Sequence, residues 1–204
     1  MLKLWGRANS SNVQKVLWTC DELGLAYERI DAGGPFGRTD EPSYRAMNPN
    51  GRVPTIDDDG FVLWESNAIM RYLAGGDPTR RLLPTGRRAA ADADKWLDWQ
   101  MATLGLSLRD LFMALARPDG SDGASVAVAA DATAGLFAIL DRHLQRAAYT
   151  VGESFTIADI ALGVSTHRWL RLPVERPRMP GLERWYDRIS GRPGFGQVAT
   201  IPVR

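Results

Sequence analysis

The amino-acid sequence predicts two units, an α/β unit over residues 1–76 followed by an all-α unit over residues 86–204. Three observations support this division. The first seventy-odd residues alternate between short apolar runs of strand length and amphipathic helical patterns. Beyond residue 86 the apolar residues recur almost only at helical spacing. Glycines and prolines punctuate the stretch between the two patterns, and we place a linker at residues 77–85.

The composition favours an ordinary globular protein and excludes several functional classes. Hydrophobic residues make up 45% of the chain, charged residues 24%, and the net charge is +1. No basic run is interleaved with aromatic residues, so we expect no nucleic-acid partner. No stretch approaches the roughly 18 apolar residues of a membrane span and no leader pattern opens the chain, so we expect a cytoplasmic protein. One cysteine and two histidines offer neither an internal disulfide nor a metal cluster.

The first unit opens with a βαβ pattern. Residues 2–5 predict a strand, and residues 13–24 predict a helix because its apolar positions fall three or four apart and Gly24 suits the position after the last turn. Residues 27–30 predict a second strand, parallel to the first because a helix connects them. Cys20 lies on the apolar face of the helix, so we interpret it as a small buried hydrophobe rather than a reactive thiol.

A ββα pattern follows, and its signals are turn residues between short apolar runs. The motif Asn-Pro-Asn-Gly-Arg at residues 48–52 is turn chemistry that leads into a strand. The predicted elements are a short helical turn over 42–47, strands over 53–56 and 61–64 joined by a hairpin turn over 57–60, and a helix that opens at residues 65–67.

The second unit is predicted from helical stripes of apolar residues. One stripe runs over residues 96–115 and another over residues 136–144. Residues 155–160 predict a further helix start, since Thr156 and Asp159 can form a capping box and the apolar residues on either side can pack as a hydrophobic staple. We interpret this box as a folding feature rather than a binding site.

Four segments stand in the order and spacing of one protein family. A βαβ unit followed by a ββα unit, with a proline entering the third strand, is the layout of the thioredoxin-like fold. With an all-helical domain behind it, the chain resembles the cytosolic glutathione transferases over essentially its whole length, and within them the serine-type, bacterial-looking members of theta or zeta type. The four segments are Ser10–Val16, Asn48–Pro54, Trp64–Leu73 and Phe155–Ile160.

The resemblance implies a glutathione-binding site on the first unit. A cis bond between Val53 and Pro54 would turn the Val53 backbone outward to pair with the cysteinyl part of glutathione, like an added strand. Glu65 and Ser66 stand where a strand meets a helix N-terminus, so Ser66 would hold the γ-glutamyl carboxylate and Glu65 the ammonium. Arg52 would meet the glycyl carboxylate. The simpler alternatives are that Ser66 only caps the helix and Arg52 is an exposed loop residue.

The resemblance also implies a catalytic serine. In the serine-type members the serine lies six residues before the valine of a Lys-Val or Arg-Val pair on the first helix. Here that valine is Val16, so the serine is Ser10, and Asn12 completes a Ser-x-Asn motif. Ser11 is the alternative donor. The serine hydroxyl would donate a hydrogen bond to the glutathione sulfur and favour the thiolate, which is the nucleophile. The simpler interpretation is that this cluster only caps the first helix.

The leading functional hypothesis is a homodimeric transferase that uses glutathione as co-substrate, without a metal, to attack a small and largely apolar electrophile. The alternatives are a glutathione-dependent isomerase or dehalogenase, and a glutathione-binding module without turnover. The absence of cysteine at positions 10–12 disfavours branches that form mixed disulfides, and Asn12 stands where zeta-type isomerases carry cysteine. Candidates for the apolar wall of the second-substrate pocket, weighed against a role in the core, are Met101, Leu104, Leu108, Met113 and Trp169.

Overall fold

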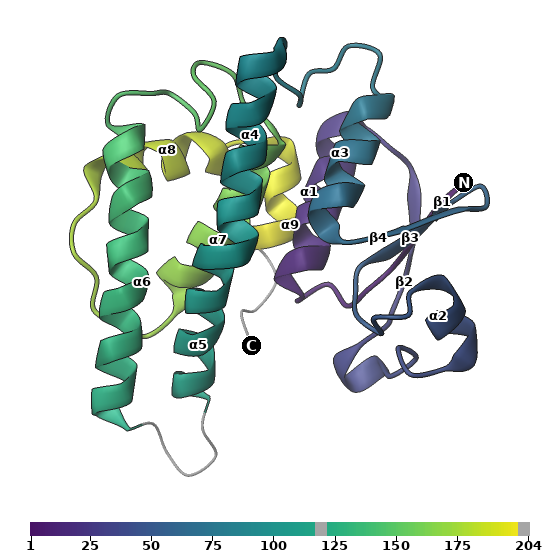
Figure 1. The fold of residues 1–204 in the computed structure, drawn as a ribbon, viewed down its shortest axis with the longest axis horizontal. Coiled ribbons are helices and arrows are strands. Elements are labelled where there is room, and N and C mark those ends of the chain that lie inside the picture. The colour runs from purple at the N-terminus through teal and green to yellow at the C-terminus, as the bar shows by residue number, and fades with distance from the viewer. Residues whose placement is uncertain (117–121, 200–204) are drawn as a thin grey trace. The chain divides into compact units, whose positions relative to one another are not determined.

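The computed structural model describes residues 1–116 and 122–199. These residues form two compact units, and the predicted classes, a thioredoxin-like α/β unit and an all-α unit, are confirmed (Figure 1). The first unit contains residues 1–83 together with the C-terminal segment that starts at Arg192, and the second contains residues 84–191. The C-terminal segment therefore packs with the first unit, whereas its place in the sequence assigned it to the second.

A four-stranded mixed sheet forms the centre of the first unit. The strands are β1 (Leu2–Trp5), β2 (Tyr27–Ile30), β3 (Thr55–Asp58) and β4 (Phe61–Trp64), in the order β2-β1-β3-β4. β1 and β2 are parallel, as predicted, and the other two pairs are antiparallel. β3 begins two residues later than predicted because Pro54 has no N–H to donate to a strand ladder. Asp57 and Asp58 extend β3 and pair with Val62 and Phe61, so the hairpin turn is shorter than predicted.

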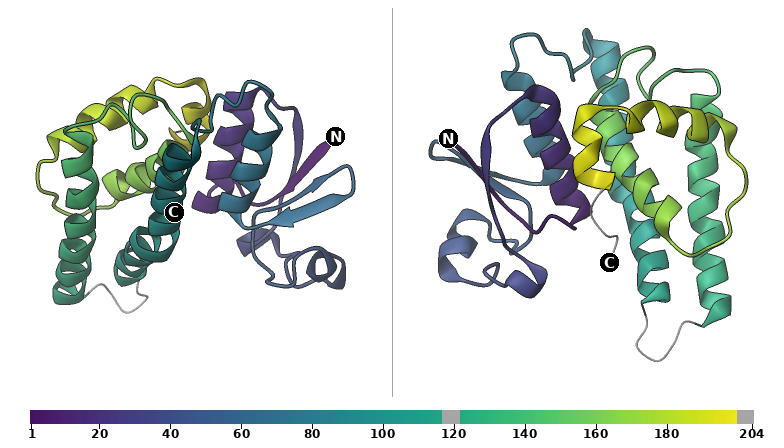
Figure 2. Two further views of the ribbon diagram at one scale, coloured as in Figure 1. Left: turned by 45° about the horizontal axis from the view of Figure 1, so that its top comes forward. Right: turned by 180° about the vertical axis from the view of Figure 1, so that it is seen from behind.

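Two helices cover one face of this sheet. Helices α1 (Ser11–Leu23) and α3 (Ser66–Gly76) lie side by side, whereas α2 (Pro42–Met47) lies on the other side of the strands (Figures 1 and 2). α1 ends at Gly24, whose φ of 67° is the left-handed conformation predicted for this glycine. The unit also contains three short helical turns, η1 (Gly34–Phe36), η3 (Pro193–Phe195) and α9 (Gly196–Ala199).

The C-terminal segment packs against α1. Phe195 meets the ring of Trp18 edge-on with a centroid distance of 5.3 Å. Gly194 is required here, because a Cβ at this residue would come within 2.3 Å of Trp18 Cδ1. Arg192 donates to both carboxylate oxygens of Glu22, at 3.0 and 2.7 Å. α1 is consequently buried on several sides rather than along the single predicted stripe.

The second unit is built from helices around a buried central one. Its elements are α4 (Arg87–Trp99), the π-helical segment η2 (Gln100–Leu104), α5 (Gly105–Leu115), α6 (Gly123–Leu144), α7 (Ile157–Arg171) and α8 (Pro180–Ser190). α7 is buried on nearly every side and forms the core. The stripe predicted over residues 96–115 includes η2, where Gln100 Nε2 donates a hydrogen bond to Ser165 Oγ of α7 at 3.0 Å.

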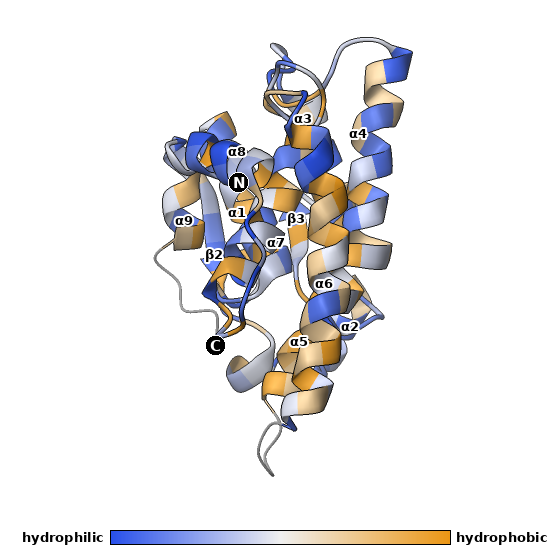
Figure 3. Ribbon diagram, turned by 90° about the vertical axis from the view of Figure 1, so that its left-hand side faces the viewer, coloured by the Kyte–Doolittle hydropathy of each residue, from blue (hydrophilic) through white to orange (hydrophobic). Residues whose placement is uncertain are grey.

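α6 has an apolar outer surface. By length and composition it could cross a membrane, the one such helix among the described residues, whereas from the sequence we expected no stretch to approach a span; a single helix of this kind is weak evidence for one. Its inner side packs in the unit, where Phe137 stacks on Trp169 at a centroid distance of 4.1 Å. On the outer side Val128 is 72% exposed and Ile139 is 40% exposed. Figure 3 colours the ribbon, including α6, by the hydropathy of each residue. Clustered exposed apolar residues on a folded protein mark a contact surface.

The predicted capping box is present at the start of α7. The Thr156 and Asp159 side chains satisfy backbone amides reciprocally, as predicted. The carboxylate of Asp159 is fully buried and also accepts hydrogen bonds from the Thr150 amide and from Trp185 Nε1, both at 2.9 Å. The box therefore joins three segments of the second unit.

Candidate functional site

Ser10 is the residue immediately before α1. Its amide donates to the Arg7 carbonyl at 3.1 Å and its carbonyl accepts from the Gln14 amide at 2.9 Å, so the backbone closes the turn into the helix without the side chain. The side chain is 8% exposed and makes no capping hydrogen bond. Within the described part of the chain, its hydroxyl has no partner. The structure thus gives no support to the interpretation of Ser10 as a simple cap.

Ser11 and Asn12 form the first turn of α1. Both are half-buried, and neither side chain hydrogen-bonds to any residue that the structure describes. A helix N-terminus carries free amides and a positive dipole end. Three polar side chains, those of Ser10, Ser11 and Asn12, therefore stand where a partial negative charge is stabilised.

Val53 and Pro54 form an edge beside the sheet. The bond between them is cis, as the resemblance implies. Val53 is half-buried, and its N–H and C=O make no hydrogen bond among residues 1–116 and 122–199. The preceding Arg52 has an exposed side chain, but its carbonyl accepts from Tyr44 Oη at 2.7 Å and from Asn48 Nδ2 at 2.8 Å. The Val53 backbone is thus free while the residue before it is fixed.

Glu65 and Ser66 join β4 to α3. Glu65 has a φ of 73°, an uncommon conformation for a residue other than glycine, and its side chain is exposed. Ser66 is the first residue of α3 and is 1% exposed. Its buried hydroxyl has no partner among the described residues, so it does not cap the helix. Buried hydroxyls without a partner are rare in folded proteins, so this one calls for an explanation.

Lys15 is a charged residue at this site to which the sequence assigned no role. It is 1% exposed, and its Nζ donates to Oδ1 of Asn67 on α3 at 2.9 Å. Burial lowers the pKa of Lys15 to about 7, and the nearby Glu65 carboxylate opposes that shift. Lys15 lies outside the apolar stripe of α1, so only the packing of α3 against α1 reveals that it is buried.

The remaining candidates lie in α1 and in the second unit. Cys20 is fully buried and burial raises the pKa of its thiol to about 12, which confirms the interpretation of a small hydrophobe. Of the residues offered for the second-substrate wall, Leu104, Leu108 and Trp169 are buried in the second unit, Met101 is half-buried and Met113 is 56% exposed. No group of three potential metal ligands occurs in the described ranges.

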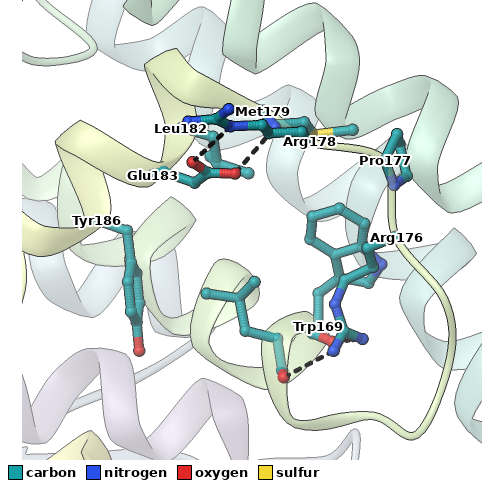
Figure 4. A pocket seen from close by; sticks show the side chains of 9 residues that line it. Trp169, Arg176, Pro177, Arg178, Met179, Leu182, Glu183 and Tyr186 are labelled. Atoms are coloured by element: carbon teal, nitrogen blue, oxygen red, sulfur yellow. Dashed lines mark hydrogen bonds and ion pairs between the residues drawn. The ribbon is translucent and has the colours of Figure 1, made fainter.

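A pocket of about 320 Å³ lies between the end of α7 and α8 in the second unit (Figure 4). Its charged side chains are already paired within the protein. Arg176 donates to the carbonyls of Leu170 and Leu172 at 3.2 and 2.8 Å, and Arg178 lies 3.9 Å from Glu183. Its charged groups thus already have partners within the protein, and we assign the pocket no function.

A thioredoxin-like sheet with a cis-proline edge and an unpartnered serine at a helix start, followed by an all-helical unit, defines the class of the glutathione transferases. Comparison with known families agrees. Residues 1–75 match the family model of the glutathione S-transferase N-terminal domain, and residues 106–193 match that of the C-terminal domain. The chain belongs to the glutathione S-transferase family.

Relatives match over the whole chain. Glutathione S-transferase GstB of Escherichia coli strain K12 is 40% identical over 207 residues, covering 100% of both chains. Disulfide-bond oxidoreductase YfcG of the same strain is 30% identical, covering 94% of this chain and 91% of that protein. The crystal structure of the theta class glutathione S-transferase from Xanthomonas axonopodis pv. citri with glutathione bound superposes with a TM-score of 0.93, at 41% identity, covering 100% of this chain and 99% of that one.

Proposed function

We propose that this protein is a glutathione transferase in which Ser10 activates the glutathione thiol. The observation that carries the proposal is the Ser10 hydroxyl, which stands at the start of α1 without a partner among the described residues. In the proposed reaction this hydroxyl donates a hydrogen bond to the sulfur while the thiol proton passes to solvent. The thiolate then forms a bond to an electrophilic carbon, and the displaced group leaves with its electron pair. Asn12 assists in the same helical turn.

Glutathione itself is proposed to bind along the first unit, with residues 1–76 as its binding domain. Its cysteinyl backbone pairs with the free N–H and C=O of Val53 beside Pro54. Its γ-glutamyl carboxylate meets Ser66 at the N-terminus of α3 and its ammonium meets Glu65. The Ser66 hydroxyl is buried, so binding includes a small side-chain movement that uncovers it. Arg52 pairs with the glycyl carboxylate.

Replacing Ser66 by alanine is expected to change ligand affinity and stability in opposite directions. The KM for glutathione should rise about tenfold, because a hydrogen bond to a charged group contributes about 1.5 kcal/mol or more. The free energy of unfolding should rise by about 1 kcal/mol, because the substitution removes a buried hydroxyl that has no partner among the described residues. Steady-state kinetics and urea unfolding of Ser66→Ala measure the two effects.

Thr166→Val provides the matched control for that prediction. The hydroxyl of Thr166 in α7 is also buried without a partner in the described structure, but it lies in the helical unit. Its removal should stabilise the protein and leave the KM for glutathione unchanged. A Ser66→Ala protein with unaltered KM would contradict the role of Ser66 in binding.

Product analysis distinguishes the candidate reactions. The protein is incubated with glutathione and a panel of aryl halides, epoxides, activated alkenes and haloacids, and free thiol and products are quantified. Conjugation consumes one glutathione per product, whereas isomerisation or dehalogenation with later release of glutathione returns the thiol. A protein that binds glutathione but turns over none of the panel is the non-catalytic module. A disulfide reaction through a protein thiol gains no support, because Cys20 is buried and its pKa is raised.

We further propose that the protein is a cytoplasmic homodimer. Support for the dimer comes from exposed apolar residues on two helices: Leu106 and Met113 of α5 are 53% and 56% exposed, and Val128 and Ile139 of α6 are 72% and 40% exposed. A second copy of the chain would cover this surface. Light scattering across a dilution series measures the mass, and a monomer at micromolar concentration would contradict the proposal.

A further inference from the structure

We propose that Tyr44 and Asn48, two buried residues at α2, are positioning residues that aim the Val53 backbone before glutathione arrives. This inference rests on the proposed function, since it assigns a purpose to the edge at which the cysteinyl backbone pairs. Tyr44 and Asn48 are each 2% exposed, so neither can touch the ligand. Their effect must pass through the chain segment that they hold.

Tyr44 and Asn48 fix the peptide bond between Arg52 and Val53. Tyr44 Oη donates to the Arg52 carbonyl at 2.7 Å, and Asn48 Nδ2 donates to the same oxygen at 2.8 Å. Two donors occupy both lone pairs of this oxygen. The Arg52 carbonyl and the Val53 N–H belong to one planar trans peptide and point in opposite directions. Holding the carbonyl toward the buried side therefore directs the Val53 N–H to the open side.

Tyr44 and Asn48 also hold Thr55, the residue after Pro54. Thr55 Oγ1 lies 2.8 Å from Tyr44 Oη and 3.0 Å from Asn48 Nδ2, so the same two side chains hold the chain on both sides of Val53 and Pro54. Thr55 is fully buried. The free N–H and C=O of Val53 thus lie between Arg52 and Thr55, both of which are held by hydrogen bonds.

All donors and acceptors of this network can be satisfied by a single placement of its hydrogen atoms. Tyr44 gives its single hydroxyl hydrogen to the Arg52 carbonyl, so it accepts from the Thr55 hydroxyl. The two amide hydrogens of Asn48 go to the Arg52 carbonyl and to Thr55, and its Oδ1 accepts from the Asn50 amide at 3.0 Å. A buried polar network with every member satisfied holds one geometry. A preorganised edge spares the ligand the entropy of ordering it.

The experiment uses Tyr44→Phe, which removes only the hydroxyl. Tyr27→Phe is the control, because Tyr27 on β2 is a half-buried tyrosine of the same unit that makes no hydrogen bond to residues 52–55. For Tyr44→Phe we expect the KM for glutathione to rise about three- to tenfold, the loss of one net hydrogen bond, with kcat within about twofold of wild type. The control should leave both constants unchanged.

A ligand comparison separates positioning from general destabilisation. S-methylglutathione contains the cysteinyl backbone that Val53 would pair with, whereas γ-glutamyl ethylamide retains only the γ-glutamyl end. Tyr44→Phe should weaken binding of the first and leave competition by the second unchanged. Equal weakening of both ligands, or an unchanged KM for glutathione, would overturn the proposal. A wild-type protein that binds neither ligand would instead refute the proposed function itself.

Discussion

Replacing Ser10 by alanine is expected to reduce the thiolate fraction of bound glutathione at pH 7 by roughly 25-fold. This value follows if the thiol pKa returns from about 6.5 to its ordinary value of about 8.5. A shift of two units requires about 2.7 kcal/mol. One charge-assisted hydrogen bond contributes about 1.5–3 kcal/mol and a helix N-terminus about 0.3–1 kcal/mol more, so a single hydroxyl at the start of α1 is sufficient. The ultraviolet difference absorbance of the thiolate measures the change directly.

Ser11→Ala is the control for this prediction, since Ser11 occupies the next position and is half-buried in the same turn. It should retain the thiolate band. The pH profile gives a second readout, because the acidic limb of kcat/KM should move up by about two pH units in Ser10→Ala and stay in place in Ser11→Ala. A band lost in Ser11→Ala and kept in Ser10→Ala would transfer the role to Ser11.

The fold was predictable because its signals are local. The βαβ and ββα patterns, the glycine after α1 and the capping box of α7 all arise from residues a few positions apart. The burial of α1 on several sides could not be predicted, because it depends on Arg192, Gly194 and Phe195. These residues follow Trp18 by more than 170 positions. A hydrophobic stripe records the faces that a helix buries locally and carries no signal for a distant segment that covers another face.

The site was predictable only as far as its motifs reach. Ser10, Val53 and Ser66 stand in segments that resemble the family, whereas Lys15 and Tyr44 acquire their roles from what folds against them. Lys15 meets Asn67 of α3, and Tyr44 meets a carbonyl that no sequence pattern marks. The second-substrate wall could not be predicted, because apolar residues that line a pocket and those that fill a core look alike in sequence. Leu104 and Leu108 are buried in the helical unit.

Replacing Asp159 by alanine is expected to lower the free energy of unfolding by about 3–5 kcal/mol. The carboxylate is fully buried and accepts hydrogen bonds from the amides of Thr150 and Thr156 and from Trp185 Nε1, all at 2.9 Å. Burial raises the pKa of Asp159, and these hydrogen bonds oppose the rise. The Thr156 hydroxyl also donates to this carboxylate, at 3.2 Å. Truncation leaves these four buried donors without their acceptor, at about 1–3 kcal/mol each before relaxation.

Asp122→Ala tests whether this effect comes from the buried network or from helix capping alone. Asp122 is the N-cap residue of α6 and its carboxylate accepts from the Ala124 amide at 3.1 Å, but unlike the carboxylate of Asp159 it is exposed. Its loss should lower the free energy of unfolding by only about 1 kcal/mol. Urea unfolding of both variants, followed by tryptophan emission, gives the comparison. Equal losses would reduce Asp159 to an ordinary cap, whereas a threefold larger loss at Asp159 requires that the carboxylate also holds Trp185 and Thr150 against the start of α7.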